Sequence, residues 1–66
     1  MTITVNGEQQ QIDEAATLLA LLERHGVPSV GSAVALNDDV VPRGRHAATP
    51  LREGDRVEII VAVAGG

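Results

Sequence analysis

The chain has 66 residues, a formal net charge of −4 and no Phe, Tyr, Trp or Cys. The negative net charge argues against nucleic-acid partners, and the absence of thiols excludes disulfides and cysteine chemistry. The longest apolar run, 59–64, is too short to cross a bilayer, and the N-terminal residues carry no signal-like pattern. We therefore expect one small cytoplasmic domain with a core of aliphatic side chains.

The first segment predicts a β-hairpin. Ile3 and Val5 alternate with threonines, Asn6-Gly7 is a preferred two-residue turn, and the apolar pattern resumes toward Ile12. We expect two antiparallel strands whose Ile3 and Val5 side chains face the core.

The spacing then changes to a helical period. Leu18, Leu21 and Leu22 fall on one helix face. Thr17 is a candidate N-cap, and Gly26 is a candidate C′ residue. Asp13 is an alternative N-cap that would begin a longer helix.

Residues 33–42 predict a second hairpin. Val34, Leu36 and Val41 should face the core around a turn at 37–39, which is rich in Asn and Asp.

Residues 43–55 predict a loop with one short helical turn and a tight turn before the last strand, 56–63. Alternation in that strand gives it two faces. Val57, Ile59, Val61 and Val63 should lie beneath the helix, and Glu58, Ile60 and Ala62 should lie on the open face.

This order of elements predicts an α+β fold with a mixed four- to five-stranded sheet packed on one main helix. It is the order of the ubiquitin-like β-grasp, in which the final strand is central and parallel to the first. We expect residues 1–64 to form this domain and residues 65–66 to form a flexible diglycine tail.

The diglycine Gly65-Gly66 is the candidate functional group. A terminal glycine carboxylate is ionised at neutral pH, is not crowded by a side chain and can attack the α-phosphorus of ATP. Two residues without Cβ can also thread a narrow cleft. Residues 26–32 mimic the glycine spacing of a phosphate-binding loop but lack its lysine, so we expect a partner to bind the ATP.

The open face of the sheet is the candidate docking surface. Ile60 and Ala62 of the last strand, with Ala33 and Ala35 of the neighbouring hairpin, should form a shallow apolar patch that a partner covers. His25 and His46 lack the spacing of metal ligands, so neither a metal site nor a catalytic residue is predicted.

Five segments together resemble the ThiS family, the sulfur carrier proteins of thiamine biosynthesis. They are ITVNGE at 3–8, ATLLALL at 16–22, VALNDDVVPR at 34–43, TPLREGDRVEII at 49–60 and the final Gly65-Gly66. The chain departs from many relatives in having Ala64 in place of a third glycine and His46 near the position of a tryptophan.

The resemblance implies a sequence of reactions at Gly66. A ThiF-type adenylyltransferase would convert it to an acyl-adenylate, and sulfur from a donor such as a cysteine desulfurase, relayed through a cysteine persulfide, would replace the AMP. The resulting thiocarboxylate would give its sulfur to the thiazole ring on the thiazole synthase ThiG. The chain would then be a protein co-substrate and not an enzyme, with no bound cofactor beyond these covalent intermediates.

Two alternatives stay open. The small subunit of molybdopterin synthase shares the terminal chemistry, although it usually runs longer and often has aromatic residues near its end. A ubiquitin-like protein modifier would join substrate lysines through the same Gly66.

Overall fold

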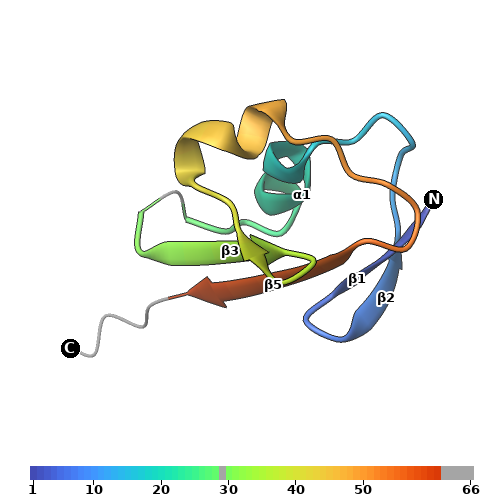
Figure 1. Ribbon diagram of the computed structural model, residues 1–66, viewed down its shortest axis with the longest axis horizontal. Helices are drawn as coiled ribbons and strands as arrows, with labels where there is room; N and C mark the ends of the chain where they lie inside the picture. The colour runs from blue at the N-terminus through green and yellow to red at the C-terminus, as the bar shows by residue number, and fades with distance from the viewer. Residues whose placement is uncertain (29, 62–66) are drawn as a thin grey trace.

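The computed structural model describes residues 1–28 and 30–61, which form a mixed sheet with its helices on one face (Figure 1). The elements in chain order are β1 (Thr2–Val5), β2 (Glu8–Gln11), α1 (Leu18–Arg24), β3 (Ser32–Leu36), β4 (Asp39–Val40), the 3-10 helix η1 (Arg43–Ala48) and β5 (Arg56–Val61). The sheet order is β2-β1-β5-β3-β4, with β5 parallel to β1 and antiparallel to β3. The predicted mixed sheet with a central last strand is confirmed.

The first hairpin forms as predicted, around a two-residue turn. Asn6 and Gly7 have φ values of 49° and 86°, the left-handed pair of a type I′ turn, which matches the twist of the strands. Val5 therefore pairs with Glu8, and Ile3 and Val5 point into the core.

Helix α1 begins and ends at the predicted residues. The Thr17 hydroxyl accepts a hydrogen bond from the Ala20 amide at 3.2 Å, and Gly26, at φ 67°, reverses the chain after the last turn. Asp13 does not cap the helix, because its carbonyl accepts from the Ala16 amide in a separate turn. No helix in residues 1–28 or 30–61 is long and apolar enough to cross a membrane.

The core lies between α1 and the sheet. It consists of nine buried aliphatic side chains: Ile3, Val5, Ile12, Leu18, Leu21, Leu22, Val34, Leu51 and Val57. Leu36, Val41 and Ile59 pack against this cluster and are partly buried. Every predicted inward position up to Ile59 thus contacts the core.

The second hairpin differs from the prediction in the length of its turn. Only Asn37 and Asp38 form the turn, with φ values of 51° and 73°, and Asp39 already belongs to β4. Asn and Asp tolerate the left-handed region better than other residues with a side chain, so a two-residue turn forms here without glycine. As a result, Ala35 pairs with Val40.

His46 is buried, which the sequence analysis did not anticipate. It lies in η1 beside α1 with 7% of its surface exposed, and its Nε2 donates to the Val41 carbonyl oxygen at 3.0 Å. The available signal was the resemblance described above, in which His46 stands near a position where many relatives carry tryptophan, a large and mostly apolar side chain. A hydrogen bond to a backbone carbonyl lets the polar imidazole take that place.

Candidate functional site

The candidate site is the end of β5 and the residues that follow it. Val61 is the last described residue, so Ala62, Val63, Gly65 and Gly66 lie outside the described residues, and their predicted positions and roles stay predictions. Gly66 is five residues beyond Val61, which limits its distance from the sheet to about 18 Å. The position of the end of β5 therefore determines where the segment that leads to Gly66 begins.

The two faces of β5 are those predicted, with one correction. Val57 is 1% exposed and Ile59 packs against the core, whereas Ile60 is 68% exposed on the other face. Val61 was expected beneath the helix but is 45% exposed. It pairs with Ser32 at the end of the sheet, and the core reaches along β5 only as far as Ile59.

Four residues form what we call the apolar patch: Ile60, Ala33, Ala35 and Val40. Ala33 pairs with Ile60 and Ala35 with Val40, so all four side chains share the open face. Ala35 is half-buried, and Val40 is 75% exposed. The sequence analysis did not name Val40, although the inward position that it predicts for Val41 places Val40 on the opposite face by alternation.

Asn6 holds β5 from the β1 side. Pairing between β1 and β5 covers only Thr4 with Arg56 and Val5 with Val57. Beyond it, Asn6 Oδ1 accepts from the Ile59 amide at 2.8 Å, and its Nδ2 donates to the Ile59 carbonyl oxygen at 3.3 Å. The Asn6 side-chain amide thus makes the two hydrogen bonds that a backbone peptide of β1 would make, and it extends the contact between β1 and β5 to Ile59.

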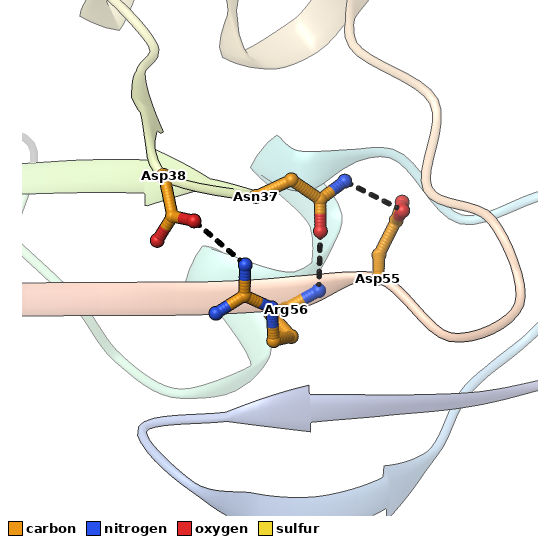
Figure 2. Close-up of polar contacts among 4 residues, drawn as sticks. All are labelled: Asn37, Asp38, Asp55 and Arg56. Atoms are coloured by element: carbon orange, nitrogen blue, oxygen red, sulfur yellow. Dashed lines mark hydrogen bonds and ion pairs between the residues drawn. The ribbon is translucent and has the colours of Figure 1, made fainter.

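Asn37 holds the other end of β5 (Figure 2). Its Oδ1 accepts from the Arg56 amide at 2.9 Å and its Nδ2 donates to Asp55 Oδ1 at 3.0 Å. The Arg56 guanidinium also donates to Asp38 at 2.7 Å, and this hydrogen bond with its attraction to Asp38 raises the pKa of Arg56 above its usual value. Because both side chains are solvent-exposed, this ion pair contributes little to stability.

Two hollows accompany these features. One of about 270 Å³ lies on the helix side, with Leu22, Val27 and His46 in its wall. The other, of about 420 Å³, lies between β1 and β5, with Asn6 and Glu58 in its wall. In the described part of the chain, no group of three or more His, Asp or Glu is placed to hold a metal ion. The site therefore consists of the end of β5, which the Asn6 side chain binds, and the exposed apolar patch beside it.

A mixed five-stranded sheet with one main helix across it and a central, parallel last strand defines a ubiquitin-like β-grasp protein. A crystal structure of a thiamine biosynthesis protein (ThiS) from Geobacter metallireducens has the same fold, with a TM-score of 0.82 and 33% identity over 100% of both chains. The ThiS family model matches residues 3–66, and the chain belongs to this family.

Two curated relatives add detail. The sulfur carrier protein ThiS of Escherichia coli (strain K12) is 32% identical over 66 residues, which cover 100% of both chains. A thiazole synthase of Paramagnetospirillum magneticum is 35% identical over 66 residues. The chain spans 20% of the length of that enzyme, so the enzyme contains a segment similar to the whole chain.

Proposed function

We propose that this protein carries sulfur for the thiazole ring of thiamine as a thiocarboxylate on Gly66. The observation that carries the proposal is the ThiS family match, which continues through residue 66. It is supported by the relative named sulfur carrier protein ThiS, which aligns over its whole length. The protein would act as a co-substrate and not as an enzyme, in the cytoplasm, where ATP and thiol-borne sulfur are present.

The proposed chemistry has three steps. An oxygen of the Gly66 carboxylate attacks the α-phosphorus of ATP held by a ThiF-type adenylyltransferase, and pyrophosphate leaves. The terminal sulfur of a cysteine persulfide, charged by a donor such as a cysteine desulfurase, attacks the carbonyl carbon, and AMP leaves. A second thiol then cleaves the acyl disulfide by exchange, which releases the thiocarboxylate and leaves a disulfide between the two thiol sulfurs.

A thiazole synthase of the ThiG type is the proposed acceptor. The support is the similarity between this chain and a segment of a thiazole synthase. The absence of cysteine and lysine from the chain fits a carrier, because an activated terminus meets no thiol or ε-amine on another copy. A protein modifier that forms chains through its own lysines fits this composition poorly.

The apolar patch is the proposed docking surface for the adenylyltransferase and the thiazole synthase. Ile60 and Ala35 belong to it, and Ala62 would extend it by one alternation of the strand. Thr4 and Gln9 of the first hairpin are polar positions on the same face, and so is Glu58, which pairs with Ala35. The apolar contact area is therefore concentrated on β3, β4 and the end of β5. A partner that covers the patch would meet the residues leading to Gly66.

Intact-mass spectrometry tests the proposal directly. After incubation with adenylyltransferase, ATP, a desulfurase and cysteine, we expect the chain to gain the mass difference between sulfur and oxygen, with the change located at Gly66 by fragmentation. Omission of ATP is the control and should prevent the gain. If enzymes that load another ThiS protein leave this chain unchanged, the proposal is wrong.

A further inference from the structure

We propose that Asn6 is a positioning residue for the reaction at Gly66, an inference that rests on the proposed function. Asn6 is not itself proposed to take part in the chemistry. It acts through Ile59, whose amide and carbonyl it binds at 2.8 and 3.3 Å. Ile59 lies seven residues before Gly66.

In the described part of the chain, the end of β5 has one neighbouring strand, β3. Val34, Ala33 and Ser32 pair with residues 59–61 on the β3 side. On the β1 side, the pairing stops at Val57, and the chain turns away at Gly7 toward β2. A strand end with a single partner opens more easily than one held on both sides. At the point where β1 ends, the hydrogen bonds of the Asn6 side chain fix β5 from its second side.

This hold matters for binding by a partner enzyme. An enzyme that accepts the segment after Val61 must fix the backbone of that segment, and each residue that is fixed lowers the chain entropy. If residues 59–61 are already fixed, this part of the entropy loss occurs on folding and not on binding. Loss of the Asn6 contacts should therefore weaken binding of the carrier and leave the chemical step nearly unchanged.

The chain contains a matched control at Asn37. Both asparagines lie in two-residue turns with φ values near 50°, and each accepts a hydrogen bond from a backbone amide of β5. Asn37 binds Arg56 at the start of the strand, and Asn6 binds Ile59 near its end. Glycine suits the left-handed conformation, so Asn6→Gly and Asn37→Gly remove the side-chain contacts without straining either turn.

Steady-state ATP–pyrophosphate exchange by the adenylyltransferase, with the full-length carrier as the varied substrate, gives KM and kcat for each variant. We expect Asn6→Gly to raise KM about five- to tenfold, the equivalent of one or two lost hydrogen bonds, with kcat changed less than about twofold. Asn37→Gly should change KM less than about twofold. Asn6→Asp, which still accepts from the Ile59 amide but cannot donate to its carbonyl, should give an intermediate KM.

Amide hydrogen exchange on the isolated variants provides a readout without enzyme. Exchange at Ile59, and at Ile60, which pairs with Ala33 of β3, should accelerate in Asn6→Gly more than in Asn37→Gly, although both variants lose a similar number of contacts. Equal KM values for the two glycine variants, or a loss confined to kcat, would overturn the inference while wild-type loading still supports the proposed function. If the wild-type chain itself is not adenylated, the proposed function fails first.

Discussion

Deletion of Gly66 is expected to abolish thiocarboxylate formation and to leave the domain folded. One extended residue spans about 3.5 Å, so the shortened chain would present its carboxylate that far from the α-phosphorus of ATP. Reacting atoms must approach to about 3–3.5 Å, and a displacement of 1 Å can slow a reaction about 100-fold. Loading of the deletion variant, followed by intact-mass spectrometry, should therefore show no sulfur gain.

Two controls accompany the deletion. Circular dichroism and the melting temperature should match the wild type, because the core of the described residues is built from side chains between Ile3 and Val57, whereas a terminal glycine has no side chain to contribute. Gly66→Ala keeps the chain length and adds only a methyl group, so it should retain part of the loading. A deletion variant that loads at the wild-type rate would show that sulfur is carried elsewhere.

Arginine at Val57 is expected to unfold the domain, whereas arginine at Ile60 should leave it folded and impair docking. Val57 is 1% exposed, so Val57→Arg places an unpaired cation in an aliphatic core, at a cost comparable with the total stability of a small domain, about 5 kcal/mol. Ile60 is 68% exposed, and substitutions at such sites usually change stability by only about 0.5 kcal/mol. Thermal denaturation of the two variants tests this contrast.

Binding measurements complete the comparison. Ile60→Arg should weaken binding to the adenylyltransferase by about 2 kcal/mol or more, roughly a 30-fold rise in Kd, as expected for a central interface residue. Gln9→Arg is the matched control, because Gln9 lies on the same face in β2 and gains the same charge. Equal losses for both variants would point to net charge and not to the apolar patch.

The fold could be predicted from the sequence because the local signals for turns, helix ends and strand faces agree with the order of the elements in the sheet. Asn6-Gly7 set the first turn, Thr17 and Gly26 set the ends of α1, and alternation in the last strand assigned Val57 and Ile60 to opposite faces. Each of these rules depends on residues close together in the chain.

The remaining features depend on contacts between distant segments. Val61 fits the inward pattern, but only the extent of the described core shows that Val61 lies beyond it and is 45% exposed. The contact between Asn6 and Ile59 joins residues 53 positions apart, and a turn preference for asparagine does not reveal a second role for its side chain. The outward position of Val40 follows from the predicted inward position of Val41, but its pairing with Ala35 depends on the two-residue turn, which the sequence analysis did not predict.

The central position of β5 also governs how the domain is made. Synthesis proceeds from β1 to β5, so the strand that joins the two hairpins is the last of the described elements to leave the ribosome. Each hairpin contains only local contacts, but the pairing of Thr4 with Arg56 closes a long loop, which slows folding relative to a helical protein of similar size. Until β5 is inserted, the aliphatic faces of both hairpins stay open to aggregation or to proteases. The segment that leads to Gly66 is therefore presented from an ordered strand only after the rest of the domain has folded around it.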